Sequence, residues 1–147
     1  MSTDTSVDPL RLMTAFWHVR MAMVERFGRR VEAETGITAK DFFALMGVQN
    51  GLAYPSDIAT SMMLPTYAVS RILEGLTNAG LLERHLDSGD ARRIRLSITK
   101  KGEKTLEAAQ KVWRAEVSTL FHQLPLEHQE QLVRHMETLA QLSREPQ

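Results

Sequence analysis

The sequence predicts an all-α fold that carries one small β-hairpin. Along most of the chain, apolar side chains recur at spacings of three and four, which is typical of amphipathic helices. Between residues 82 and 99 the spacing changes to two on both sides of the turn-rich segment Ser88-Gly89-Asp90. Such alternation around a turn indicates two antiparallel strands with a basic tip and with an apolar face turned inward, formed by Leu82, Leu86, Ile94, Leu96 and Ile98. The length of 147 residues fits a single domain, and no repeat or linker divides it.

The first half of the chain predicts helices with clear end signals. Apolar periodicity places these helices over residues 9–34, 38–49, 55–63 and 65–79. Gly36 suits the C-terminal cap of the first helix, and Thr38 with Asp41 resembles a capping box at the start of the second. Only Met63 to Pro65 separates the last two helices, a spacing that is typical of a helix-turn-helix.

The helical spacing returns after the hairpin, from Lys101 to about Gln123, and Pro125 is placed where a last helix can start. These two helices carry more apolar surface than one small domain can cover. The residues concerned are Phe121, Leu124, Leu126, Leu132, Met136 and Leu139. Some of them belong to the core of their own chain, and the others predict an interface between two copies.

The composition excludes several classes of protein and of site. The chain has no cysteine, so disulfides, thiolate metal sites and cysteine nucleophiles are excluded. No stretch approaches the ~18 consecutive apolar residues that a membrane helix needs. Residues 1–8 lack the basic start and the apolar core of a signal peptide, so we expect a cytoplasmic protein with a disordered N-terminal tail over these residues.

The formal net charge is zero, but the charges are unevenly distributed. Residues 65–104 carry eight basic and five acidic side chains, whereas the segments before and after them are slightly acidic. A solvated face is the ordinary explanation of such an excess. A local basic patch that binds a polyanion is the alternative.

A helix-turn-helix followed directly by a basic hairpin predicts a winged helix, whose second helix can enter the major groove of DNA. With Val69, Ile72, Leu73 and Leu76 facing the core, the opposite face of this helix is polar. That face carries Thr66, Tyr67, Ser70, Arg71 and Glu74. Arg71 suits guanine, because its guanidinium matches the two acceptors of that base. Glu74 is expected to orient Arg71 through a pair between residues i and i+3.

The hairpin turn predicts a second contact with DNA. Asp90 precedes Arg92 by two residues and can hold its guanidinium by hydrogen bonds. Arg92 is then placed to enter a narrow minor groove, where the negative potential is strongest. Arg93 and Arg95 are expected to contact the DNA backbone, which contributes little to sequence preference.

Two stretches carry a resemblance to a known family. Residues 59–71 resemble the helix-turn-helix of MarR-type transcriptional regulators, and residues 80–102 resemble the wing of that family and the helix start that follows. In spacing, the similarity covers nearly all of residues 9–145. It implies a homodimer that binds a pseudo-palindromic operator, most often as a repressor. The groove-contacting positions of the family fall on Thr66, Tyr67, Ser70, Arg71, Asp90 and Arg92.

The resemblance also implies that different segments of the chain form the dimer and bind DNA. Residues 9–34 and 101–145 would form the dimerisation helices, and residues 38–99 the DNA-binding lobe. Three residues depart from the family pattern. Met63 stands where a small residue such as Gly is common in the turn, Tyr54 where a Ser or Thr cap is common, and Pro65 where Ser is common.

Members of the family often bind small anionic aromatic compounds between the dimer helices and the DNA-binding lobe. A comparable pocket here would be lined by Phe16, Trp17, Arg20, Phe43, Met46 and Trp113. Arg20 is available to a carboxylate, although aromatic residues at helical spacing are more often core. We expect no cofactor.

Other functions fit the sequence less well. Five histidines raise the possibility of a metal site, but His128 and His135 stand too far apart on a helix to bind one ion as a pair. The chain has no phosphate-binding glycine loop and no nucleophile elbow, so we expect no enzyme. A winged helix that binds protein, or a dimer that binds DNA without sequence preference, remains the alternative. Arg71 favours DNA binding over a protein-interaction module, because such a module has no need of a guanidinium at that position.

Overall fold

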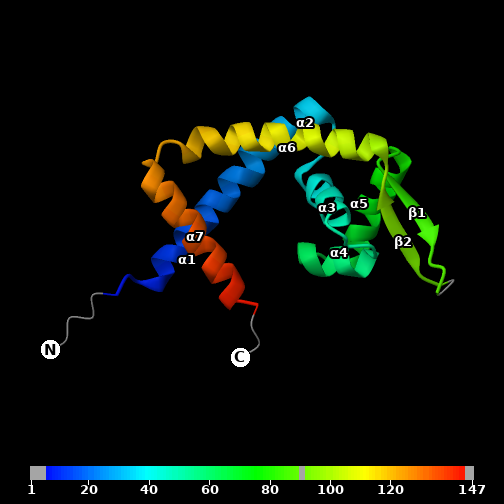
Figure 1. Ribbon diagram of the computed structural model, residues 1–147, viewed down its shortest axis with the longest axis horizontal. Coiled ribbons are helices and arrows are strands. Elements are labelled where there is room, and N and C mark those ends of the chain that lie inside the picture. Colours follow the sequence, from blue (N-terminus) through cyan, green and yellow to red (C-terminus); the bar gives the residue numbers. More distant parts are fainter. Residues whose placement is uncertain (1–5, 90–91, 145–147) are drawn as a thin grey trace. The chain divides into compact units, whose positions relative to one another are not determined.

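The computed structural model describes residues 6–89 and 92–144, and the chain divides into two compact units, residues 1–113 and 114–147. In chain order the elements are α1 (Pro9–Ala22), the π-helical turn η1 (Met23–Phe27), α2 (Gly28–Thr35), α3 (Ala39–Gln49), α4 (Pro55–Met62), α5 (Thr66–Asn78), β1 (Leu82–Leu86), β2 (Ile94–Ile98), α6 (Lys100–Phe121) and α7 (Leu126–Leu142) (Figure 1). The boundary between the units falls within α6. This architecture confirms the predicted all-α class with a small hairpin.

The N-terminal helices end and begin where the sequence signals place them. The helix expected over residues 9–34 contains the π-helical turn η1, which periodicity did not predict. Gly36 ends α2 in the left-handed conformation, with φ of 76°. The capping box is confirmed, because the Thr38 hydroxyl accepts from the Asp41 N–H and the Asp41 carboxylate accepts from the Thr38 N–H.

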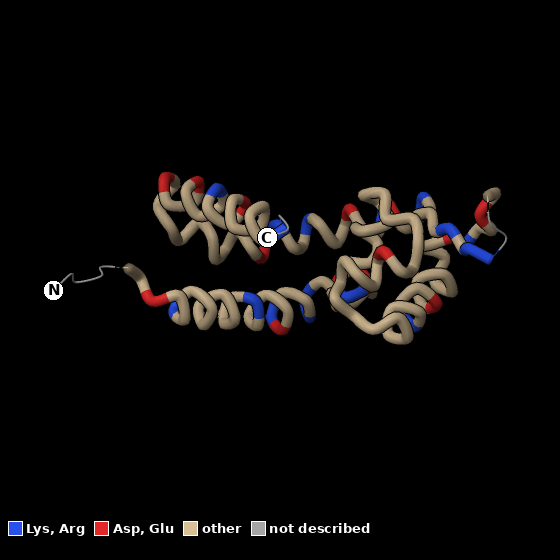
Figure 2. Tube along the Cα trace, turned by 90° about the horizontal axis from the view of Figure 1, so that it is seen from below, with Lys and Arg blue, Asp and Glu red and all other residues tan. Residues whose placement is uncertain are grey.

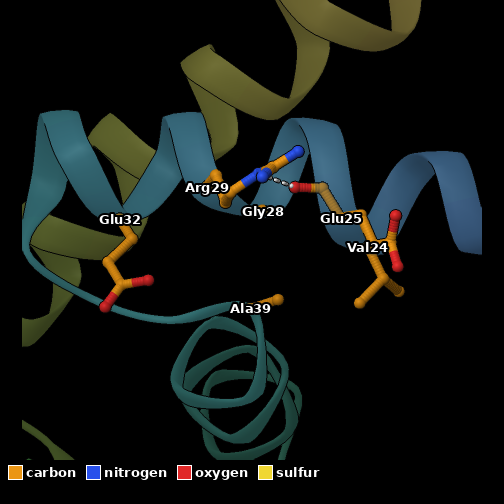
Figure 3. A pocket seen from close by; sticks show the side chains of 6 residues that line it. All are labelled: Val24, Glu25, Gly28, Arg29, Glu32 and Ala39. Atoms are coloured by element: carbon orange, nitrogen blue, oxygen red, sulfur yellow. Dashed lines mark hydrogen bonds between the residues drawn. The ribbon is translucent and has the colours of Figure 1, made fainter.

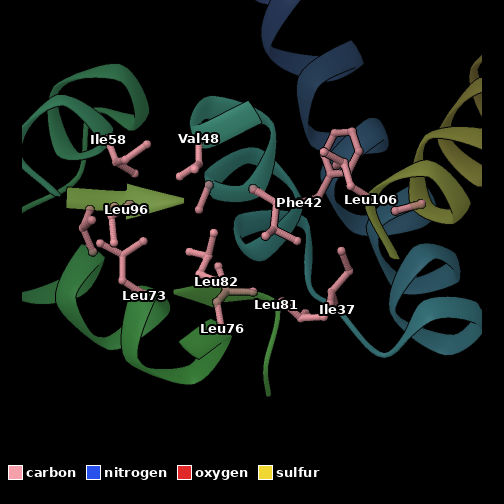
Figure 4. Close-up of a cluster of buried hydrophobic side chains, with 14 of the residues drawn as sticks. Ile37, Phe42, Val48, Ile58, Leu73, Leu76, Leu81, Leu82, Leu96 and Leu106 are labelled. Atoms are coloured by element: carbon pink, nitrogen blue, oxygen red, sulfur yellow. The ribbon is translucent and has the colours of Figure 1, made fainter. Parts of the chain in front are cut away.

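Helices α2, α3, α4 and α5, the hairpin and the first half of α6 enclose one hydrophobic core (Figure 4). Its largest fully buried side chains are Leu45, Ile58, Leu73, Leu82, Leu106, Val31 and Val69. From α5, Val69, Leu73 and Leu76 are buried as predicted, and Ile72 is partly buried against the same cluster. The core therefore holds α5 by one face and leaves the other in solvent.

The hairpin is antiparallel, with Leu82 opposite Ile98 and Leu86 opposite Ile94. Only its base is buried: Leu82 is 1% and Leu96 3% exposed. The expectation of an inward apolar face is wrong at the turn end, where Leu86 is 73% and Ile94 38% exposed. The reason is that this end extends beyond the helices that cover the base (Figure 1).

The second unit holds the end of α6 and all of α7. The α7 side chains leave a broad apolar face in solvent. Leu132, Val133, Met136, Leu139 and Leu142 are each between 39% and 59% exposed. None of the described helices combines the length and the apolar character needed to cross a membrane.

The turn between α4 and α5 stores backbone strain at Met63. Its φ of 53° and ψ of 41° lie in the left-handed region, and it is the only non-glycine residue with positive φ in the described part of the chain. The side chain is 91% exposed, so no packing compensates for this conformation. An L-residue held here costs about 1–2 kcal/mol relative to the right-handed conformation.

We expect Met63→Gly to raise the free energy of unfolding by about 0.5–1 kcal/mol. The substitution removes the strain, and the greater entropy of glycine in the unfolded chain offsets part of that gain. Urea denaturation measures the change. Ser61→Gly, at an exposed position within α4, is the matched control and should lower stability. A loss of stability in both variants would contradict the assignment of strain to Met63.

The start of α6 packs closely against the base of the hairpin at Gly102. A Cβ atom at this position would overlap the carbonyl oxygen of Leu81 and crowd the Ile98 side chain. We expect Gly102→Ala to lower the free energy of unfolding by about 1–3 kcal/mol, the usual effect of overpacking. Gly75→Ala is the control, since no atom lies within 4 Å of its added Cβ, and it should stabilise α5 by about 0.5–1 kcal/mol. The same thermal unfolding temperature for the two variants would contradict this packing.

Candidate nucleic-acid interface

The outward face of α5 carries the four side chains that the sequence predicts for base contacts. Thr66, Tyr67, Ser70 and Arg71 are all exposed, and Tyr67 is 71% exposed. They share this face because Val69 and Leu73, on the opposite side, are buried in the core. The structure thus brings the predicted α5 residues together on one polar surface.

The expected pair between Arg71 and Glu74 is not formed. Both side chains are exposed, and neither takes part in an ion pair in residues 6–89 and 92–144. Side chains three apart on an exposed helix gain only a few tenths of a kcal/mol from pairing, which is too little to hold them in one conformation. Arg71 therefore keeps its guanidinium donors available.

The hairpin presents the basic residues predicted for the wing. Arg92, Arg93 and Arg95 are exposed, and Figure 2 shows basic positions gathered on the hairpin beside its turn. Arg95 lies opposite His85 in the register of the strands. Asp90, predicted to hold Arg92, lies outside the described residues.

A hydrogen bond joins the start of α4 to the hairpin. The Tyr54 hydroxyl donates to Oδ2 of Asp87 over 2.7 Å, although the two residues are 33 positions apart. Asp87 follows the last residue of β1, and its Oδ1 accepts from the Gly89 N–H at 3.3 Å. Tyr54 occupies the N-cap position of α4 without making a capping hydrogen bond. The departure from a Ser or Thr cap thus gives the tyrosine a role outside its own helix.

Arg93 stacks on the ring of the same tyrosine. Its Cζ lies 3.8 Å from the centroid of the Tyr54 ring, a close cation–π contact. The Arg93 carbonyl accepts from the Asp87 N–H at 2.9 Å, so the backbones of the two residues are also joined across the hairpin. Arg93, predicted only as a contact with the DNA backbone, is therefore also held by its own chain.

A backbone contact next to Tyr54 fixes the hairpin base. The Leu96 N–H of β2 donates to the Ala53 carbonyl at 2.7 Å. The segment Ala53–Tyr54 therefore anchors the hairpin at two places, one on β2 and one just beyond β1. The sequence pattern did not indicate Tyr54 and Asp87 as site residues. The only signal was a tyrosine at a capping position, which did not indicate its partner.

The hydrogen bond between Tyr54 and Asp87 shifts both groups. It lowers the pKa of the Asp87 carboxyl, because the hydroxyl donates to the charged form, and the Gly89 N–H and two arginines act in the same direction. It raises the pKa of the Tyr54 phenol, which must stay protonated to donate. Its stabilising contribution is thus fully present between the ordinary pKa values of the two groups. It is lost as pH falls through the lowered Asp87 value or rises through the raised Tyr54 value.

The residues predicted to line a ligand pocket fall into two groups. Phe43 and Trp113 are in ring contact, with centroids 6.2 Å apart, and Met46 packs against the core beside them. Arg20 instead stacks on Trp17, its Cζ 5.5 Å from the ring centroid, and Phe16 and Trp17 are more than half exposed on α1. Within the described residues, Trp113 Nε1 is buried without a hydrogen-bond partner, so the Phe43–Trp113 group contains a buried, unused donor.

A cavity of about 400 Å³ lies where η1, α2 and the start of α3 meet, and none of the six predicted residues lines it (Figure 3). Two carboxylates, those of Glu25 and Glu32, lie at its wall. Arg29 already donates from Nε to the Glu25 carbonyl at 2.8 Å. The two carboxylates disfavour an anionic ligand in this cavity.

The chain is similar to known regulators in sequence and in fold. A sequence model of the MarR family matches residues 35–93, which contain α3, α4, α5, β1 and the turn of the hairpin. No curated protein matches the chain.

Solved structures agree over most of the chain. The transcriptional regulator BldR from Sulfolobus solfataricus superposes with a TM-score of 0.81 at 23% identity, covering 93% of this chain and 96% of its own. Wild-type MarR from E. coli gives a TM-score of 0.78 at 18% identity, covering 91% of this chain and 98% of its own. The S. aureus MepR–DNA complex gives a TM-score of 0.72 at 25% identity, covering 89% of this chain and 96% of its own.

The hydrogen bond of Tyr54 predicts an elevated phenol pKa that can be measured directly. The chain has two tyrosines, so Tyr67→Phe leaves Tyr54 as the only phenol. In that background we expect the ultraviolet titration midpoint of the phenol to lie above 10.0. Adding Asp87→Ala removes the acceptor and its charge and should lower the midpoint. The same midpoint with and without Asp87 would exclude the bond in solution.

Proposed function

We propose that this chain, which belongs to the MarR family through residues 35–93, is a transcriptional regulator that binds operator DNA by sequence. Helix α5 would enter the major groove, and the wing would contact the flanking minor groove and the backbone. The DNA complex of MepR, at 25% identity, supports DNA as the partner of this fold. The known members among the similar structures are regulators rather than enzymes, which supports a binding function.

The observation that carries the proposal is the position of Arg71. It stands on the exposed face of α5, beside Ser70 and one turn from Tyr67, and it makes no ion pair in the described part of the chain. Neither folding nor the core explains a guanidinium at this place. A bidentate contact with guanine in the major groove does. Thr66, Tyr67 and Ser70 would contact bases or phosphates around it.

The wing would supply the second set of contacts. Arg92, beside the hairpin turn, would enter the minor groove, and the wing Asp90 would orient it. Arg93 and Arg95 would contact phosphates, which raise affinity without reading sequence. The excess of basic residues over 65–104, in a chain of zero net charge, supports a DNA-facing surface confined to this part of the chain.

We further propose that the protein acts as a homodimer, most simply as a repressor. Residues 9–34 and 101–145 would form the dimer interface, and residues 38–99 the DNA-binding lobe. The apolar faces support this arrangement, since Leu10, Met13 and Trp17 of α1 are more than half exposed and α7 has no buried residue. A two-fold axis would place two copies of α5 about 34 Å apart, one turn of duplex DNA.

The proposal includes release of DNA by a small aromatic or anionic ligand. The buried, unpartnered Nε1 of Trp113 offers a hydrogen bond within the Phe43–Trp113 group. Met46 packs against the same core as Trp113, and Phe16, Trp17 and Arg20 would complete the pocket only if a ligand brought the two groups together.

Selection of bound sequences from a random duplex pool tests the function, with affinity followed against salt concentration. We expect enrichment of an inverted repeat with half-sites about ten base pairs apart. A steep salt dependence with no enriched sequence would instead indicate non-specific DNA binding. No binding at moderate salt, also after refolding to remove any bound ligand, would favour a protein-interaction module.

On the selected operator, we expect Arg71→Ala to weaken binding by about 1–3 kcal/mol and to relax the preference at one base pair of each half-site. Competition between the operator and single-base variants measures both effects. Lys40→Ala, which removes an exposed charge from α3, is the control and should leave the preference intact. Equal weakening by Arg71→Ala on all sequences would reduce this residue to a phosphate contact.

A further inference from the structure

Away from its base, the hairpin is tied to the start of α4 through the side chain of Tyr54. The base of the wing is held by buried Leu82 and Leu96 and by the bond from Leu96 to Ala53. Beyond the base, Leu86 and Ile94 are exposed and contribute little packing. This outer part is restrained by the hydrogen bond between Tyr54 and Asp87 and by the contact of Arg93 with the Tyr54 ring.

We propose that Tyr54 and Asp87 are positioning residues that aim Arg93 at the DNA backbone. This inference rests on the proposed DNA-binding function. It adds a role for the two residues that join the N-cap of α4 to the hairpin. The Tyr54 hydroxyl holds the end of β1 through Asp87, and the Tyr54 ring supports the Arg93 guanidinium from one side.

The geometry makes the three residues one unit. Asp87 and Arg93 are already joined across the hairpin by a backbone hydrogen bond of 2.9 Å. Movement of one therefore carries the other, and the hydroxyl at 2.7 Å restrains both relative to α4. The ring in turn lies 3.8 Å from the Arg93 Cζ, so the tyrosine supports the guanidinium as well as the strand end.

The charges leave Arg93 able to bind phosphate. Asp87 is engaged by the Tyr54 hydroxyl and the Gly89 N–H, and it forms no ion pair with Arg93 in the described residues. A stacked guanidinium keeps its N–H donors in its own plane, directed away from the ring. Arg93 is exposed, so those donors face solvent. A side chain that is ordered before binding loses less entropy when it contacts DNA.

A purely structural role for the contact between Tyr54 and Asp87 would have different consequences for DNA binding. If Tyr54 only stabilised the fold, its hydroxyl would affect the unfolding transition, and its effect on DNA binding would not depend on Arg93. If it positions Arg93, the hydroxyl and the guanidinium act on the same contact. Their effects on affinity are then not additive.

The test is a double-mutant cycle on the full chain with the selected operator, comparing wild type, Tyr54→Phe, Arg93→Ala and the double variant. Tyr54→Phe removes only the hydroxyl and keeps the ring. We expect it to weaken binding about fivefold, the effect of one hydrogen bond, and to reduce the salt slope toward that of Arg93→Ala. In the Arg93→Ala background it should have no further effect.

Ser97→Ala is the matched control, because it removes a hydrogen bond of 2.9 Å with His85 that lies within the hairpin. It should leave operator affinity unchanged. Thermal unfolding of all variants separates loss of positioning from loss of fold, and we expect Tyr54→Phe to unfold no earlier than Ser97→Ala.

Three results would overturn the inference. Equal weakening of binding by Tyr54→Phe with and without Arg93 would make the role of the hydroxyl structural. Affinity unchanged in Tyr54→Phe, while Arg71→Ala still weakens binding, would refute the positioning role and leave the proposed function intact. Absence of DNA binding by the wild-type protein would refute both.

Discussion

The burial of one face of α5 is the constraint on which the rest of the site depends. Val69, Leu73 and Leu76 are fully or almost fully buried against α3, α4 and the base of the hairpin. On a helix, three such residues determine the orientation of every other side chain. The polar residues Ser70 and Arg71 lie outward for this reason. The same core holds Leu82 and Leu96, so the packing that orients α5 also sets where the wing begins.

The two parts of the candidate interface are held by different kinds of interaction. Helix α5 is positioned by apolar packing, which is strong and tolerates changes in salt and pH. The outer wing is positioned by a partly buried hydrogen bond and a cation–π contact, both involving Tyr54. The wing is thus the part of the interface that the solvent and a bound polyanion can most readily influence. This difference fits the proposed roles, with base contacts on the helix and phosphate contacts on the hairpin.

Local signals in the sequence predicted much of this fold. Gly36, the Thr38–Asp41 capping box and Pro55 mark helix ends because each acts on backbone groups within one turn. The outward residues of α5 follow from its apolar spacing in the same way. The bond from Tyr54 to Asp87 could not be predicted, since it joins residues 33 positions apart and depends on how the hairpin packs. Alternation likewise suggested that Leu86 faces inward, but periodicity does not show where the covering helices end.

Methylation interference at guanine N7 on the selected operator tests the central claim most directly, that α5 places Arg71 in the major groove. N7 lies in the major groove and accepts from arginine, so a methyl group there blocks the contact. We expect interference at one guanine in each half-site with the wild-type protein. With Arg71→Ala, we expect this interference to be lost. An unchanged interference pattern in Arg71→Ala, or binding that no guanine methylation affects, would contradict this claim.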